Sequence, residues 1–129
     1  MSPLSVTVHR DPPPVGILSL VGEHDAYSAT RIENELALLL DSGLHVVVDL
    51  TEATFVDSQT LSVLLAARHQ AEQTHVGFVL VLSPDDHTQV HRILEMTGLG
   101  SAFADEPTLE RATAASRRGH AAGERVRAA

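Results

Sequence analysis

The sequence predicts a single α/β domain with a mixed β-sheet of four to five strands packed with about four helices. Apolar runs of strand length alternate with amphipathic stretches of helical spacing along most of the chain, a pattern typical of strands joined by crossover helices. The chain opens with two strand-like runs joined by a short turn, so one strand pair should be antiparallel. Its 129 residues, 43% of them hydrophobic, suffice for one core and therefore one domain.

The two opening runs are predicted to form a hairpin. Residues Leu4 to His9 alternate between apolar and polar side chains, as expected of a strand with one buried face. Three consecutive prolines, Pro12 to Pro14, then fix the backbone in a turn and remove hydrogen-bond donors. Residues 15–21 form the return strand, and the hairpin should lie at an edge of the sheet.

A helix and a central strand follow the hairpin. Either Asp25 or Ser28 can cap a helix that Gly43 terminates. Large apolar residues recur at helical spacing between these limits, at Ile32, Leu36, Leu39 and Leu40. Residues 45–50, HVVVDL, are apolar at successive positions, which is typical of a strand covered on both faces.

The second half of the chain repeats the alternation. The predicted elements are a helix at 58–73, a strand at 76–82, a helix opened by Ser83-Pro84-Asp85 and ended by Gly98, a very short strand at 102–104 and a last helix at 107–115. Beyond residue 115 the chain has almost nothing to bury, so ordering it would cost entropy without compensation. The predicted domain therefore spans residues 1–115, and residues 116–129 are expected to be a disordered tail.

Composition and charge argue against several classes of function. The net charge is −8, and residues 1–111 carry 16 acidic side chains against 5 arginines. Nucleic-acid binding depends on basic side chains that neutralise phosphates, so we expect no nucleic-acid partner. The absence of cysteine excludes disulfides and thiolate metal sites. No window approaches the roughly 18 apolar residues that cross a bilayer, so we expect a soluble cytoplasmic protein with no membrane partner.

The segment from Phe55 to Leu65, FVDSQTLSVLL, holds the candidate site. Asp57 and Ser58 lie between an apolar strand and an apolar helix. Both residue types are favoured at helix starts, because their side-chain oxygens accept hydrogen bonds from unpaired N–H groups. The same position exposes a hydroxyl where a helix N-terminus favours an added phosphate. Helix cap and phosphate acceptor are compatible roles, and both stay open on sequence spacing.

Three segments, in order, resemble one known family. Residues 46–73, VVVDLTEATFVDSQTLSVLLAARHQAEQ, are similar to the central strand, loop and helix of STAS domains, specifically the bacterial anti-sigma factor antagonists. Residues 20–29, LVGEHDAYSA, are similar to the family's loop before its first helix, and residues 93–103, ILEMTGLGSAF, to its characteristic later segment. The resemblance runs from about residue 4 to residue 111. It implies a single STAS-like domain that is not an enzyme and needs no cofactor.

The resemblance also implies a mechanism. In that family, the serine directly after the motif's aspartate is phosphorylated by a partner that is both anti-sigma factor and serine kinase, and by position this serine is Ser58. The unphosphorylated form binds the anti-sigma factor and frees the sigma factor for transcription. Phosphorylation breaks the complex, and a serine phosphatase resets it. Thr60, in the place of the usual glycine, is a second candidate acceptor. The implied partner-binding residues are Glu23, Asp25, Asp57, Ser58, Gln59 and Thr60.

Other functions stay open or are argued against by the residues. The altered DSQT motif leaves open a STAS scaffold that is not phosphorylated, or a docking subunit of a larger assembly. A hydrolase is not indicated, because Ser58 lacks both glycines of a G-x-S-x-G elbow. His87 and His91 lie four apart on the predicted third helix and could share a metal, but no third ligand is fixed, so no metal site is predicted. Asp49 and Asp57 imitate a receiver domain's acidic pocket only loosely, since the chain has no lysine.

Overall fold

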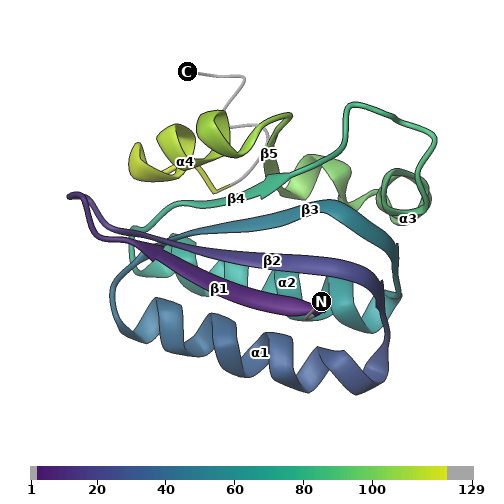
Figure 1. Cartoon of the computed structure of the whole chain (residues 1–129), viewed down its shortest axis with the longest axis horizontal. Coiled ribbons are helices and arrows are strands. Elements are labelled where there is room, and N and C mark those ends of the chain that lie inside the picture. Colours follow the sequence, from purple (N-terminus) through teal and green to yellow (C-terminus); the bar gives the residue numbers. More distant parts are fainter. Residues whose placement is uncertain (1–2, 122–129) are drawn as a thin grey trace.

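The computed structural model describes residues 3–121, in which five strands form one sheet flanked by helices (Figure 1). The strands are β1 (Leu4–His9), β2 (Val15–His24), β3 (His45–Val56), β4 (Phe78–Val81) and β5 (Ala104–Glu106). The helices are α1 (Ala26–Asp41), α2 (Ser58–Gln73), α3 (Gln89–Thr97), α4 (Leu109–Arg117) and the short 3-10 helix η1 (Leu99–Ala102). None of the helices in this part of the chain has the length and apolarity needed to cross a membrane.

The strands lie in the order β1-β2-β3-β4-β5, which is also their order in the chain. β1 and β2 are antiparallel, and the other three neighbouring pairs are parallel. Parallel neighbours require crossover connections, which α1, α2 and the α3–η1 segment provide. The predicted α/β class, the mixed sheet and the opening hairpin at a sheet edge are therefore confirmed.

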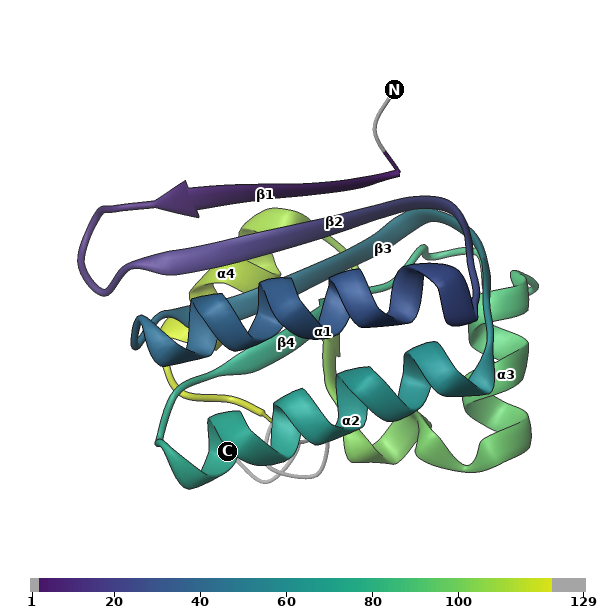
Figure 2. The same cartoon turned by 90° about the horizontal axis from the view of Figure 1, so that it is seen from below.

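Helices cover both faces of the sheet (Figures 1 and 2). The larger core cluster lies between one face and α1, α2 and α3, and it includes Val46 and Val48 of β3. Val47 points the other way and packs in a smaller cluster with Ala112 and Ala115 of α4. Successive valines thus serve opposite cores, which confirms the prediction of a strand covered on both faces.

β2 and β3 run further than predicted, to His24 and Val56 rather than to residues 21 and 50. They pair with each other over this extension, and two register shifts interrupt the pairing. Such irregularities break the apolar–polar alternation from which strand ends are predicted. The extension carries the chain beyond β4, whose pairing with β3 ends at Asp49, and places the loops before α1 and α2 past the body of the sheet.

The third helix begins later than predicted. Thr88, rather than Ser83, is its N-cap, and Thr88 Oγ1 accepts a hydrogen bond from the His91 N–H at 3.2 Å. The segment after it also differs, because η1 occupies residues 99–102 and the short strand moves to Ala104–Glu106. Gly98 ends the helix as predicted, with a left-handed backbone (φ 72°) that glycine adopts without strain.

Residues 116–121, which the sequence assigns to the tail, pack against the sheet. Ser116 and Ala121 are buried. Gly77 lies so close to the Ser116 carbonyl that a side chain at this position would collide with it. Small residues allow this approach, and a count of large apolar residues does not detect it. The packed chain therefore continues to Ala121, and the remaining tail, residues 122–129, lies outside the described residues.

His45, at the start of β3, should make the stability of the fold depend on pH. Its Nδ1 accepts a hydrogen bond from the Gly77 N–H at 2.9 Å. Burial, and to a smaller extent the Arg117 guanidinium, lower the pKa of His45 below its ordinary value of 6.5. As the pH falls, His45 therefore takes up a proton at a higher pH in the unfolded chain than in the folded chain. The stabilisation is therefore present above about pH 6.5 and is lost as the pH falls through the folded-state pKa.

We expect the urea midpoint of the wild type to fall more steeply between about pH 7 and pH 5 than that of His45→Asn. The asparagine side-chain oxygen can accept the Gly77 N–H without titrating in this range. His69→Asn, at an exposed histidine of α2, is the control and should keep the wild-type slope. Parallel curves for the wild type and His45→Asn would contradict the assignment.

Candidate functional site

The two loops that hold the candidate residues leave the sheet side by side. In the last pairs of β2 and β3, Glu23 lies opposite Phe55 and His24 lies opposite Val56. α1 and α2 start directly after these pairs, at the same end of the sheet (Figure 2). The exposed side chains there form what we call the helix-start surface, made of Glu23, Asp25, Tyr27, Phe55, Ser58 and Gln59.

Asp57, and not Ser58, is the N-cap of α2. Asp57 has an extended backbone, and its Oδ1 accepts a hydrogen bond from the Thr60 N–H at 2.8 Å. Ser58 occupies the first helical position and is exposed. Within residues 3–121, no group forms a hydrogen bond with its hydroxyl, and the Ser62 hydroxyl donates to its backbone carbonyl instead. The structure thus separates the two roles that spacing left open, because the cap is Asp57 and the Ser58 hydroxyl is free.

Thr60, the second candidate acceptor, points into the protein. Its side chain is fully buried, and Oγ1 donates a hydrogen bond to the His24 carbonyl at 3.3 Å. A kinase could reach this hydroxyl only after the start of α2 had opened. Burial therefore removes Thr60 from the candidate acceptors and from the candidate partner contacts. It also keeps the β-branched side chain away from the outer surface next to Ser58.

Asp25 has the same capping role at the start of α1. Its Oδ1 accepts a hydrogen bond from the Tyr27 N–H at 2.9 Å, so Asp25 rather than Ser28 is the cap. Tyr27 itself is 95% exposed, and Phe55 is 39% exposed. Neither aromatic was among the predicted site residues. Tyr27 could have been found from the sequence, because it falls outside the apolar stripe of α1.

His24 forms hydrogen bonds with the starts of both helices, α1 and α2. Its ring is completely buried and lies 3.0 Å from the Val21 carbonyl through Nε2 and 3.1 Å from Ser28 Oγ through Nδ1. A carbonyl can only accept, so Nε2 is the donor in the contact with Val21. The His24 backbone carbonyl accepts from the Asp57 N–H (3.2 Å) as well as from Thr60 Oγ1. One buried residue therefore fixes the start of α2 relative to the loop before α1.

Gln89, the first residue of α3, forms hydrogen bonds with the last residue of β3. Its amide oxygen accepts a hydrogen bond from the Val56 N–H, and its amide nitrogen donates to the Val56 carbonyl, both at 2.9 Å. The side chain thus pairs with Val56 as a neighbouring strand would. No sequence signal pointed to Gln89, because the contact joins residues 33 positions apart.

The capping geometry predicts stability effects of different size for two neighbouring substitutions. Asp57→Ala should lower the free energy of unfolding by about 1 kcal/mol, because it leaves the Thr60 N–H without its acceptor. Ser58→Ala should change it by less than about 0.5 kcal/mol, because the hydroxyl is exposed and unbonded. Urea unfolding of the two variants measures both effects. A large loss in Ser58→Ala alone would contradict the assignment of the cap.

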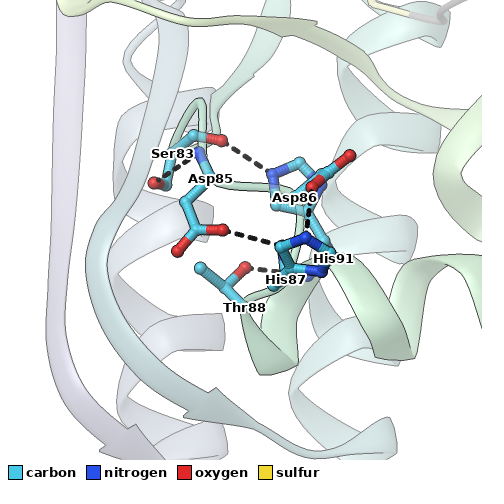
Figure 3. A network of polar contacts seen from close by, with 6 residues as sticks. All are labelled: Ser83, Asp85, Asp86, His87, Thr88 and His91. Atoms are coloured by element: carbon cyan, nitrogen blue, oxygen red, sulfur yellow. Dashed lines mark hydrogen bonds and ion pairs between the residues drawn. The ribbon is translucent and has the colours of Figure 1, made fainter.

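The two histidines considered as metal ligands lie at the start of α3, His87 in the loop before the helix and His91 in its first turn (Figure 3). His91 Nε2 lies 2.7 Å from the Ser83 carbonyl, to which it donates a hydrogen bond. His87 precedes α3, its side chain is 94% exposed, and its Nε2 lies 3.6 Å from Asp86 Oδ1. The histidines therefore do not share a helix face. Among residues 3–121, no three potential ligands gather as a metal site.

Asp49 and Asp57 are not brought together. Asp57 follows Asp49 by eight positions, which is about 25 Å in extended chain. Asp49 Oδ1 instead accepts hydrogen bonds from the backbone N–H (3.0 Å) and the hydroxyl (2.8 Å) of Thr51. The structure therefore offers no acidic pocket of the receiver type between these two residues.

Comparison with known families and proteins agrees with this geometry. The family model of the STAS domain matches residues 6–112. The anti-sigma-B factor antagonist of Listeria monocytogenes is 32% identical over 81 residues, which cover 62% of this chain and 68% of that protein. The match to the family model begins within β1 and ends in α4, so it includes both loops of the helix-start surface.

Two solved structures extend the comparison. An anti-sigma factor antagonist from Mycobacterium paratuberculosis superposes with a TM-score of 0.72 at 27% identity, covering 88% of this chain and 94% of that one. The Bacillus cell fate determinant SpoIIAA in its phosphorylated form gives a TM-score of 0.60 at 18% identity, covering 85% and 97%. At 18% identity, the likeness to SpoIIAA is one of fold.

Proposed function

Because the chain belongs to the STAS domain family, we propose that it is an anti-sigma factor antagonist whose binding is switched off by phosphorylation of Ser58. The unphosphorylated chain binds an anti-sigma factor with serine-kinase activity through the helix-start surface. This binding releases a sigma factor for transcription. The chain is the substrate of the kinase rather than a catalyst, and a serine phosphatase restores the binding form. All four proteins act in the cytoplasm.

The observation that carries this proposal is the position of the Ser58 hydroxyl. It is exposed and unbonded at the first position of α2, while the neighbouring Asp57 caps the helix. Phosphorylation therefore need not break the cap or uncover a buried group. The N–H groups of a first helical turn favour an added phosphate, so the fold tolerates both states of the switch.

The physical basis of the switch is repulsion between phosphates. To accept a phosphate, the Ser58 oxygen must come within bonding reach of the γ-phosphate of ATP in the kinase. The phosphoserine that results carries a charge of about −1.5 to −2. When the kinase binds a second ATP, two groups of like charge face each other in a desolvated interface, which costs several kcal/mol. The phosphorylated chain consequently dissociates.

The helix-start surface also suggests how the unphosphorylated chain is held. Glu23 and Asp25 supply negative charge at its rim, and Tyr27 and Phe55 supply exposed aromatic area. Aromatic side chains are enriched among the residues that dominate interface energies. The partner should therefore present an apolar pocket bordered by basic residues.

The proposal is tested by intact-mass measurement after incubation of the chain with ATP and its cognate kinase. We expect one added phosphate in the wild type and none in Ser58→Ala. Ser62→Ala, at an exposed serine one turn further along α2, is the matched control and should be phosphorylated like the wild type. Binding without any phosphate transfer would instead support the alternative function, a STAS scaffold or a docking subunit of a larger assembly.

A further inference from the structure

The two edges of the sheet are protected to different degrees. β5 is only three residues long and carries two acidic residues, Asp105 and Glu106. β1 is six residues long, LSVTVH, and contains no acid, arginine, proline or bulge. Proteins usually protect edge strands against pairing with other chains by these very features. The unprotected edge of β1 therefore suggests that another strand covers it.

The backbone of β1 has hydrogen-bonding groups available at this edge. The Pro3 carbonyl accepts a hydrogen bond from the Val21 N–H at 2.9 Å, which fixes the alternation along the pair with β2. Odd-numbered residues of β1 therefore bond to β2, and the N–H and C=O groups of Val6 and Val8 point outward. Among residues 3–121, no strand lies on that side.

A groove of about 530 Å³ runs beside the same edge, between β1 and α1. Its apolar lining includes two of the exposed large hydrophobic residues outside the helix-start surface, Leu38 (63% exposed) and Val6 (37%). Its lining also includes one basic and one acidic residue, Arg10 and Glu35. Neither of these forms an ion pair with another described residue.

We propose that this face binds a second copy of the chain, through antiparallel pairing of β1 with its own copy about a two-fold axis. The two sheets then form one continuous sheet, and the α1 helices of the two copies meet over the joined edge. Leu38 and Val6 of both copies become buried there. The two-fold axis places the grooves of the two copies against each other in opposite directions, so that Arg10 of one copy faces Glu35 of the other.

Charge favours a second copy over a different occupant. The net charge of the chain is −8, so two copies repel each other unless they meet at a face where charges balance. The groove contains one charge of each sign, whereas the helix-start surface carries Glu23 and Asp25 and no basic residue. A two-fold contact uses the same patch on both copies, so the pairing of opposite charges is satisfied twice.

Dimerisation through β1 would leave the proposed partner surface open. The groove lies along the side of the sheet, and the helix-start surface lies at the ends of β2 and β3 (Figure 2). A dimer would present two such surfaces to partners. The inference therefore stands or fails independently of the proposed function.

Sedimentation velocity of the purified full-length chain tests the proposal, over a range from about 1 to about 100 μM. We expect the wild type to reach the mass of two chains in this range. Leu38→Lys should raise the dimer dissociation constant at least about tenfold, and an exposed helical lysine should not impair folding. Met96→Lys, at an exposed residue of α3 outside the groove, is the control and should dimerise like the wild type.

Reversal of the charges tests the contact between copies directly. Arg10→Glu and Glu35→Arg should each weaken the dimer about tenfold, and the double variant should regain most of the wild-type affinity. A wild type that stays monomeric throughout the range would overturn the proposal. So would a dimer that is insensitive to Leu38→Lys and to both single reversals, because that dimer would use another face.

Discussion

Phosphorylation of Ser58 is expected to weaken binding to the anti-sigma factor about 100-fold, Ser58→Asp about tenfold, and Ser58→Ala less than threefold. The order follows the charge added at position 58, because phosphoserine carries about −1.5 to −2 charges and aspartate carries −1. The hydroxyl is unbonded in the free chain, so its removal should cost little. Titration calorimetry of the four forms against the partner loaded with a non-hydrolysable ATP analogue, which prevents phosphorylation of the wild type, measures these affinities.

A control is needed because the chain is already acidic. Ala114→Glu adds the same charge on an exposed position of α4, which covers the opposite face of the sheet (Figure 1). This variant should bind like the wild type if the effect at Ser58 is local. Equal affinities of Ser58→Asp and Ser58→Ala would rule out the electrostatic switch.

Tyr27→Ala should weaken the same complex by about 2 kcal/mol, or about 30-fold. A tyrosine that is 95% exposed contributes almost nothing to its own fold, so its aromatic area is available to a partner. Its position is fixed, because its own N–H is bonded to the Asp25 cap. The loss should therefore appear in the affinity, with the free energy of unfolding changed by less than about 0.5 kcal/mol.

Leu109→Ala is the matched truncation for this experiment. Leu109 is an exposed apolar residue at the start of α4 (38% exposed), on the other face of the sheet. Its truncation should leave the affinity unchanged. If Tyr27→Ala and Leu109→Ala bind equally well, the partner does not use the start of α1, and the interface must be placed elsewhere around Ser58.

The contacts below the helix-start surface explain how two exposed loops can present one partner site. His24 bonds to both loops, and Gln89 holds the end of β3. Both residues are polar side chains in or near the core, and their bonding groups have partners in the Val21 and Val56 backbone and the Ser28 hydroxyl. Such contacts fix the position of a loop relative to its neighbours. Ser58 is thus supported from two sides although no residue between 3 and 121 forms a hydrogen bond with its hydroxyl.

The sequence alone determined the fold class, the order of the elements and the candidate acceptor. Apolar periodicity is a local property, so it was sufficient to identify the first four strands, the four helices and the central position of β3. The hydroxyl after Asp57 was found because residue types near a helix start are constrained by its unpaired N–H groups. The motif containing Ser58 also carried the family resemblance that the comparisons confirmed.

Only the tertiary structure decided how the candidate residues divide their roles. Asp57 and Ser58 are equivalent as caps in sequence, and packing against the His24 carbonyl determines that Asp57 caps, Thr60 is buried and Ser58 faces outward. The late start of α3, the packing of residues 116–121 and the Gln89 contact likewise depend on partners distant in the chain. Local propensity carries no information on such partners, because a side chain's exposure is set by what packs on it in three dimensions.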